Sequence, residues 1–206
     1  SSIGNQALAA EETLVVTAGS SEDPTAPLKG IVATRTLSAT KTAAEIVKTP
    51  QSVSVVTRDQ MRALDVTSVS QALRYSAGVF TEYRGSSNRN DEVFVRGFSY
   101  VPKFLDGLSY GATASSQTGT FDPWLLERVE LVRGPASVLY GRSSPGGIVA
   151  LTSRKPSFDP GGEIKLFAGN NNQRGAAFDV TGALDDNDRV AARLSGMTRY
   201  ADSQFE

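Results

Sequence analysis

Apolar and polar residues alternate with a period of two along the segment Leu126–Arg133. Within it, Arg128 and Glu130 stand between apolar neighbours. Successive side chains of a strand point to opposite faces, so this period predicts a half-buried strand whose charged residues occupy its other face.

Glycine and proline corners follow this strand. Gly134-Pro135 ends it, and Ala136–Tyr140 can make one helical turn closed by Gly141. Pro145–Gly147 then turns the chain into a second apolar strand, Ile148–Thr152. Many small mixed domains contain such a unit, so the pattern predicts a fold element and no function.

Two capping boxes predict short helices upstream. Thr57 with Gln60 opens the first, and Ser68 with Gln71 opens the second, which is predicted to end at Gly78. One face of the second helix carries Val69, Ala72, Leu73 and Ala77.

Two further signals mark short local structures. Asp106-Gly107 between apolar pairs predicts a tight hairpin. Asp122-Pro123 predicts the start of a short helix.

After Pro156 the alternation of period two returns in three longer segments, separated by polar turns at Asn170–Gln173 and Asp185–Asp188. One face of these segments carries Ile164, Leu166, Ala168, Phe178, Val180, Gly182, Leu184, Val190, Ala192, Leu194, Gly196 and Tyr200. Strands near ten residues with one apolar face occur in transmembrane barrels and also in soluble antiparallel meanders. The residues alone favour the meander.

Composition excludes several classes of function. The 206 residues carry a formal net charge of -1, which gives no electrostatic footprint for nucleic acid. The sequence contains no Cys and no His, so it offers no thiol nucleophile, no Ser-His triad and none of the commonest zinc or haem ligands. No apolar run approaches the roughly 20 residues of a membrane helix.

Gly19–Gly30 is rich in Pro and small polar residues and is predicted to be a flexible linker.

Five segments together resemble a known family. The unit Leu126–Thr152 resembles the plug-domain signature of TonB-dependent outer-membrane receptors. Glu12–Ala18 resembles a TonB box, Pro50–Thr57 resembles the first plug strand, and Val93–Phe98 and Phe104–Gly107 follow in the family's order. The resemblance extends from Glu12 to about Pro156.

The resemblance implies an α+β fold. It predicts a plug domain with a small mixed sheet and short helices, followed by the first antiparallel strands of a transmembrane barrel of about 22 strands. We expect an N-terminus with the TonB box and linker at 1–30, the plug at 31–158 and barrel strands at 159–206. The implied location is the outer membrane of a Gram-negative bacterium, with the plug inside the barrel.

The segment Arg84–Asn88 resembles the apical loop of ferrichrome-type hydroxamate-siderophore receptors. A guanidinium donates in a rigid fork that suits hydroxamate oxygens around ferric iron, although Arg84 could instead pair with Glu82 or Asp91. The shorter loop Ser99–Lys103 and the absence of an aromatic pair at Ala112–Ser116 make a ferrioxamine as well matched as ferrichrome. The expected ligand-binding residues are Arg84, Ser99, Tyr100, Tyr110, Ser115 and Ser116.

The resemblance assigns the tethered N-terminal segment to TonB, a periplasmic protein that couples receptors to the inner-membrane energising complex. A short β-branched strand can add to a partner's sheet edge through main-chain hydrogen bonds. The alternative is a first strand that docks permanently in its own domain. The residues assigned to the box are Glu12, Thr13, Leu14, Val15, Val16 and Thr17.

The other implied partners are a ferric siderophore and, through the full barrel, outer-membrane lipid and lipopolysaccharide. No nucleic acid, catalytic residue or covalently bound cofactor is implied, and ferric iron enters only as a chelate. The alternative function is a free-standing soluble periplasmic interaction or signalling domain, which the residues after Glu206 would distinguish. The charged residues of the plug region are expected to pair with a polar barrel lumen, or else to be solvated; they are Arg96, Glu127, Arg128, Glu130, Arg133, Arg142 and Arg154.

Overall fold

The computed structural model describes residues 30–33, 35–36, 44–45, 52–83, 92–99, 101–110, 120–134, 144–170, 172–185, 187 and 189–202. Their elements are β1 (Arg35–Thr36), β2 (Ala44–Glu45), β3 (Val53–Thr57), α1 (Arg58–Ala63), α2 (Val69–Leu73), β4 (Val79–Thr81), β5 (Val93–Val95), β6 (Lys103–Leu105), β7 (Leu108–Tyr110), the 3-10 helix η2 (Pro123–Leu125), β8 (Leu126–Arg133), β9 (Gly147–Ser153), β10 (Gly161–Ala168), β11 (Arg174–Ala183) and β12 (Ala191–Tyr200). No helix among these residues is long and apolar enough to cross a membrane.

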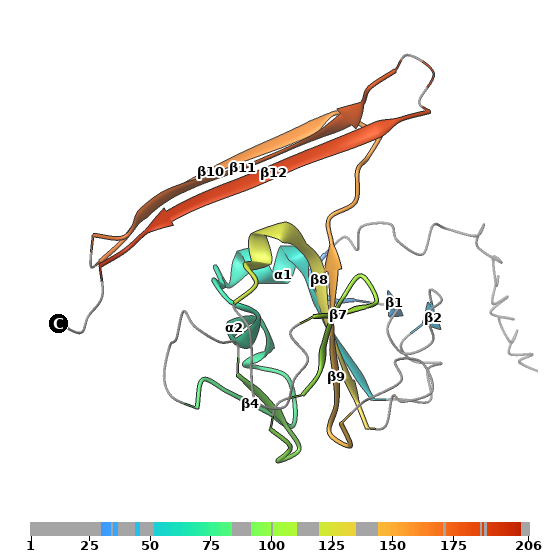
Figure 1. Ribbon diagram of the computed structural model, residues 1–206, viewed down its shortest axis with the longest axis vertical. Helices are drawn as coiled ribbons and strands as arrows, with labels where there is room; N and C mark the ends of the chain where they lie inside the picture. The colour runs from blue at the N-terminus through green and yellow to red at the C-terminus, as the bar shows by residue number, and fades with distance from the viewer. Residues whose placement is uncertain are drawn as a thin grey trace, which may run out of the picture.

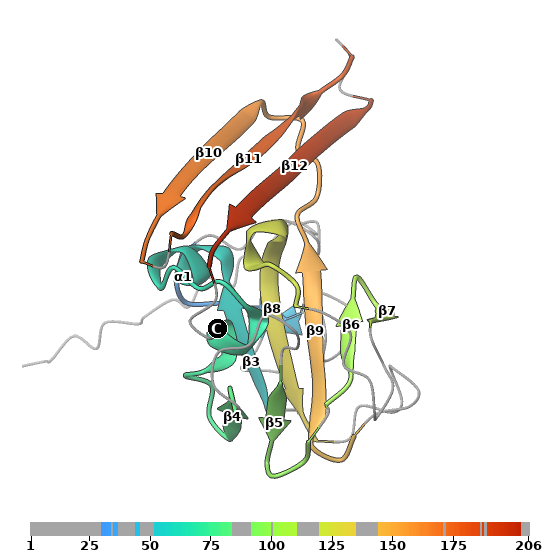
Figure 2. The ribbon, with the colours of Figure 1, turned by 60° about the vertical axis from the view of Figure 1, so that its left-hand side comes forward.

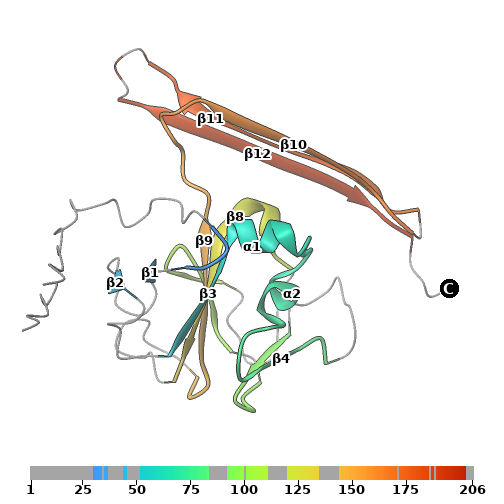
Figure 3. The same cartoon turned by 180° about the vertical axis from the view of Figure 1, so that it is seen from behind.

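A five-stranded mixed sheet organises the first part of the chain. Its strand order is β3-β8-β9-β6-β7, with β6 parallel to β9 and the other neighbours antiparallel. Helices α1 and α2 lie on one side of this sheet, and the β1–β2 pair lies on the other (Figures 1 and 3). The predicted mixed sheet with short helices is therefore confirmed.

Strand β8 is buried along its whole length, so the prediction that it is half-buried is wrong. Val129 and Leu131 pack into the main apolar core beneath the helices. On the opposite face, Val132 packs into a second apolar cluster, and the Arg128 and Glu130 side chains beside it are excluded from water. The reason is that β8 has a strand on each edge and cover on each face, and Arg128 Nε lies 3.5 Å from Glu130 Oε1.

Both predicted helix caps are present. The Thr57 hydroxyl accepts from the Gln60 N–H at 3.2 Å, and the Ser68 hydroxyl accepts from the Gln71 N–H at 3.1 Å. Each bond satisfies an amide that has no partner inside the helix. Gln71 Oε1 in turn accepts from the backbone N–H of Thr67 at 2.8 Å.

Helix α2 is shorter than predicted. It ends at Leu73 instead of continuing to Gly78, and Ala77 is exposed although it was assigned to the apolar face. Gly78 has a φ of +72° and its carbonyl accepts from the Arg96 N–H at 2.9 Å. The glycine therefore shapes the turn into β4, and the residues before it form turns.

The predicted hairpin and the predicted helix start are both confirmed. Asp106 and Gly107 have φ values of +49° and +84°, as a two-residue turn with the twist of a hairpin requires. The Asp122 carboxylate accepts from the Trp124 N–H at 2.9 Å and caps η2.

The last three strands form an antiparallel sheet in the order β10-β11-β12, which lies beyond the α1 end of the plug (Figures 1 and 2). The alternation predicted from sequence is confirmed. Ile164 and Leu194 are 77% and 67% exposed on one face, whereas Glu163 and Asp179 point to the other face, where they pair with Arg58 of α1 and with Arg154, just after β9. The structure thus shows a mixed-sheet unit, which we call the plug after the resemblance described above, followed by further antiparallel strands.

We expect Gly147→Ala to destabilise the plug strongly. Gly147 has a φ of +127°, and an added Cβ would lie 2.0 Å from the Val132 carbonyl oxygen, so the β8–β9 pairing must shift. The loss should reach about 3 kcal/mol or more. Gly107→Ala is the matched control, because its φ is +84° with nothing within 4 Å, and it should cost roughly 1–2 kcal/mol. The urea midpoint for protease resistance of this part of the full-length protein measures both, and equal midpoints would contradict the backbone clash.

Candidate functional site

Two of the predicted ligand-binding residues lie in the described part of the chain. Ser99 is exposed and follows a tight turn at Val95–Phe98. Tyr110 ends β7 and packs edge-on against Phe121, with ring centroids 5.8 Å apart. The other predicted residues lie outside the described residues and stay predictions: Arg84, Tyr100, Ser115, Ser116 and the TonB box from Glu12 to Thr17.

Aromatic side chains from the described residues on both sides of the Arg84 loop form an aromatic surface. The rings of Phe80, Tyr83 and Phe94 lie 5.7–6.2 Å apart, and Phe80 and Tyr83 are exposed. Glu82, one alternative partner for Arg84, is already held in an ion pair by Arg74. This ion pair raises the pKa of Arg74.

A buried charge cluster joins the plug to the last three strands. The Arg154 side chain, just after β9, is 3% exposed, and its guanidinium donates to the Asp179 carboxylate of β11 at 2.9 Å. Arg193 of β12 binds the same carboxylate through two nitrogens, each at 2.9 Å. The Arg154 guanidinium also lies 5.5 Å from the centre of the Trp124 ring. Among the charged residues that were expected either to pair with a polar lumen or to be solvated, Arg154 is buried and paired with a carboxylate of the last three strands.

Burial shifts the protonation equilibria of this cluster. Loss of water, with Arg58 and Arg193 nearby, lowers the pKa of Arg154 to about 10, so the side chain stays charged at neutral pH. Burial also raises the pKa of the Glu127 carboxyl, although the arginines around it act in the opposite direction.

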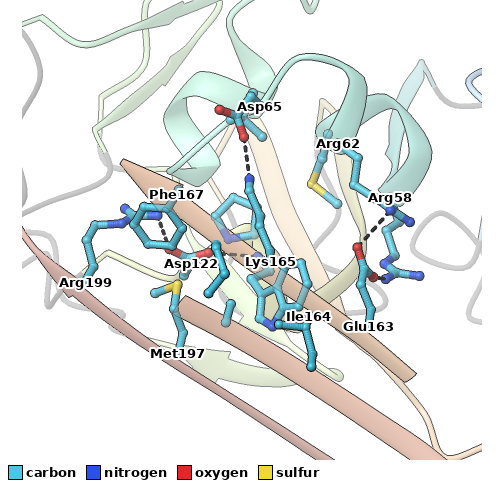
Figure 4. Close-up of a pocket in the computed structure, with 16 residues that line it drawn as sticks. Arg58, Arg62, Asp65, Asp122, Glu163, Ile164, Lys165, Phe167, Met197 and Arg199 are labelled. Atoms are coloured by element: carbon cyan, nitrogen blue, oxygen red, sulfur yellow. Dashed lines mark hydrogen bonds and ion pairs between the residues drawn. The ribbon is translucent and has the colours of Figure 1, made fainter. Parts of the chain in front are cut away.

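A second group of ion pairs lies at the surface between α1, η2 and strands β10–β12, which we call the seam (Figure 4). The pairs that cross it are Arg58 and Arg62 with Glu163, Asp65 with Lys165, and Asp122 with Arg199. Asp65 is 75% and Lys165 41% exposed, and exposed pairs of this kind contribute only about 0–1 kcal/mol each. The other pairs of the seam are less exposed: the Arg58 and Glu163 side chains are each 22% exposed, and Arg154 lies 3.9 Å from the same Glu163 carboxylate. The Asp65–Lys165 pair is therefore the most weakly held contact of the seam.

A cavity of about 470 Å³ opens along the seam (Figure 4). Its apolar wall includes Met61 of α1, Trp124 of η2, Phe167 of β10 and Met197 of β12. The ion pairs of the seam surround this apolar wall, so the cavity can hold a molecule with both apolar and polar surfaces.

The seam residues were missed by the sequence analysis. None of them was singled out for this contact: Glu163 and Lys165 lie on the polar side of the predicted strand after Pro156, and Arg58 lies in the short helix that Thr57 opens. One sequence feature could have pointed to these contacts, namely the polar side of the strands after Pro156. If the apolar side of these strands faces lipid, the polar side must face protein or water. The sequence does not show which plug residues oppose it.

Glu127 gives the plug a pH dependence whose sign follows from its raised pKa. Between the ordinary value of 4.5 and the higher folded-state value, the folded state binds more protons than the unfolded state, so stability falls as pH rises. We expect Glu127→Gln to remove this fall, and Asp159→Asn, at an exposed position, to leave it unchanged. Urea unfolding of the full-length protein over this pH range measures the slopes; an unchanged slope in Glu127→Gln would contradict the burial effect.

The family described as TonB-dependent Receptor Plug Domain matches residues 45–148. The chain is 66% identical over 171 residues to the ferrioxamine B receptor of Salmonella typhimurium strain LT2, covering 81% of this chain and 24% of that protein. It is 44% identical to the ferrioxamine receptor of Yersinia enterocolitica, covering 96% and 28%, and 38% identical to the ferrichrome outer membrane transporter/phage receptor of Escherichia coli K12, covering 94% and 27%. The chain thus spans about a quarter of the length of these relatives.

Solved structures of larger receptors share this fold. The pyoverdine outer membrane receptor of Pseudomonas aeruginosa PAO1 bound to pyoverdine superposes with a TM-score of 0.76 at 25% identity, over 89% of this chain and 26% of that chain. The ferric preacinetobactin receptor of Acinetobacter baumannii gives a TM-score of 0.74 at 21% identity, over 86% and 27%.

Proposed function

Because the chain belongs to the family of TonB-dependent receptor plug domains, we propose that it forms the N-terminal part of an outer-membrane receptor that imports a ferric hydroxamate siderophore, with a ferrioxamine as the expected ligand. The observation that carries this proposal is the 66% identity to a ferrioxamine B receptor across most of the chain. Iron is cargo here, carried as a chelate, and the protein makes and breaks no covalent bond.

The strand sheet supports a place in the outer membrane of a Gram-negative bacterium. Strands β10–β12 turn apolar residues such as Ile164 and Leu194 outward, where lipid and lipopolysaccharide would contact them. Their polar residues face the plug. We assign residues 1–30 to the tether, 31–158 to the plug and 159–206 to the first strands of a closed barrel of about 22 strands.

The ligand is assigned to the end of the plug opposite the α1 end. Arg84 would donate its guanidinium fork to the oxygens of the chelate, next to the aromatic surface of Phe80, Tyr83 and Phe94. The ion pair of Glu82 with Arg74 favours this role over a pair with Glu82. Further contacts are assigned to Ser99, Tyr100, Tyr110, Ser115 and Ser116.

The TonB box is assigned to the periplasmic side, where the receptor would bind TonB. Leu14–Thr17 would add as a strand to TonB in the periplasm, and Gly19–Gly30 would transmit the pull to the plug. Binding of the chelate would make the box available, which couples two distant sites through one domain.

Growth under iron limitation tests the proposal. We expect cells that carry the full-length receptor to grow on ferric ferrioxamine B as the sole iron source, and cells that lack either the receptor or TonB not to grow. Growth that is equal with and without TonB would contradict the proposal, and the soluble interaction domain would then be favoured.

A further inference from the structure

A second cavity, of about 340 Å³, lies where the start of the seam meets the buried charge cluster of Arg154 and Asp179. Among the described residues, four guanidiniums and two carboxylates line it, which leaves an excess of two positive charges. The charged residues of this lining, which we call the arginine pocket, are Arg58, Arg62, Arg154, Glu163, Asp179 and Arg193.

The Asp179 carboxylate has no capacity left for a further donor. It accepts from Arg154 and Arg193 at 2.9 Å each, from a second nitrogen of Arg193, and from the Ser195 hydroxyl. Two carboxylate oxygens offer about four lone-pair sites, and these bonds occupy them. The buried Nε of Arg154 has no hydrogen-bond partner among the described residues, so this carboxylate does not satisfy the whole guanidinium.

The Glu163 carboxylate is likewise shared. It pairs with Arg58 and Arg62 of α1, with Arg62 Nη2 at 2.8 Å from Oε1 (Figure 4). Arg154 lies 3.9 Å from the same carboxylate, which is too far for a hydrogen bond. Each guanidinium carries five N–H donors, so the four in the arginine pocket have more donors than two carboxylates can accept. Spare donors and excess positive charge together suit an oxyanion.

Burial makes the excess charge effective. The Arg154 side chain is 3% exposed, and loss of water, followed by repulsion from Arg58 and Arg193, lowers its pKa to about 10. The neighbouring carboxylates act in the opposite direction without cancelling this effect. An anion bound among these guanidiniums would offset the repulsion between them.

Glycines leave the strand side of the arginine pocket open. Gly161 and Gly162 of β10 line it, and Gly161 pairs with Thr181 of β11 on the polar face of the strands. An added Cβ at Gly161 would lie 3.8 Å from Thr181 Cγ2, an ordinary contact, so this position has room. Apolar residues such as Ile164 occupy the opposite face, so a lipid headgroup would approach from the wrong side.

We propose that the arginine pocket binds a free phosphate-type oxyanion, which joins the arginines of α1 to Arg154 and Arg193 beside the last strands. The bound anion strengthens the contact between the plug and these strands, so the phosphate concentration tunes how firmly the two parts hold together. The inference goes beyond the proposed function, because it does not depend on which chelate the receptor takes.

Equilibrium binding of radiolabelled inorganic phosphate to the purified full-length receptor tests the site. We expect saturable binding at one site, at an ionic strength held constant with chloride. Arg62→Gln should weaken it at least tenfold; this side chain is 53% exposed, so its loss should leave the fold intact. Arg199→Gln is the matched control, because Arg199 pairs with Asp122 outside the arginine pocket, and it should change affinity less than twofold. The absence of saturable binding, or equal losses in both variants, would overturn the proposal.

A carboxylate placed in the pocket gives a second test. Gly161→Asp supplies a permanent negative charge beside the arginines, so it should abolish phosphate binding. Because a ligand stabilises the state that binds it, phosphate should raise the urea midpoint of the unmodified receptor and leave that of Gly161→Asp unchanged. An equal rise in both proteins would overturn the proposal. Lipopolysaccharide should not displace the radiolabelled phosphate, and displacement would overturn the assignment to a free anion.

Discussion

Leu14→Pro in the full-length receptor is expected to abolish uptake of ferric ferrioxamine B while leaving its binding unchanged. Proline removes a backbone donor and fixes φ, so the segment can no longer pair along TonB's sheet edge. The ligand site lies elsewhere and should be unaffected. Radiolabelled chelate measures binding at 0 °C and uptake after warming in the same cells.

Glu22→Pro is the matched control for this substitution. It lies in the linker, which already contains Pro24 and Pro27 and is not predicted to pair with a partner strand. Uptake should stay normal. Normal uptake in Leu14→Pro as well would show that TonB does not engage this segment, and the docked first strand would become the better interpretation.

Arg84→Ala is expected to weaken binding of ferric ferrioxamine B by roughly 10- to 100-fold. The estimate follows from the loss of charge-assisted hydrogen bonds worth about 1.5–3 kcal/mol. Arg84→Lys keeps the charge but loses the planar fork, so it should recover only part of the affinity. Fluorescence titration of the purified full-length receptor measures the dissociation constants.

Arg189→Ala controls for the loss of a surface arginine. Arg189 is exposed in the turn between β11 and β12 and donates only its backbone N–H, to Asp185, among its described contacts. Its removal should leave affinity unchanged. Equal affinities of Arg84→Ala and the unaltered receptor would remove Arg84 from the ligand site.

Local features of the fold were predictable because their causes lie within a few residues. Thr57 and Ser68 cap helices whose free amides they face directly, and Asp106-Gly107 adopts positive φ values that few other residue pairs tolerate. The period of two after Pro156 placed apolar and polar faces correctly, because it depends only on strand geometry.

Features that depend on distant neighbours could not be predicted. The charges of β8 were assigned to a half-buried strand because the pattern of one strand does not reveal what covers its second face. The end of α2 was misplaced because Gly78 looked like a helix terminator, whereas its positive φ serves the turn into β4. Glu163 pairs with Arg58 and Asp65 pairs with Lys165, and each pair is separated by about 100 residues in the sequence. No local pattern identifies such pairs.

The candidate sites divide in the same way. Without the family resemblance, the residue patterns predict only a flexible linker, a β-branched strand and a loop arginine. Each of these has an ordinary structural explanation. Their order along the chain, shared with a family, turned them into a receptor hypothesis. The seam and its cavity came from the structure, because they require the strand sheet and α1 to face one another.

The most direct test of the account is calorimetric titration of the purified full-length receptor with ferric ferrioxamine B and, separately, with a ferric tris-catecholate chelate. We expect saturable binding of the hydroxamate chelate at one site and no saturable heat from the catecholate. Saturable binding of the catecholate with none of the hydroxamate would contradict it.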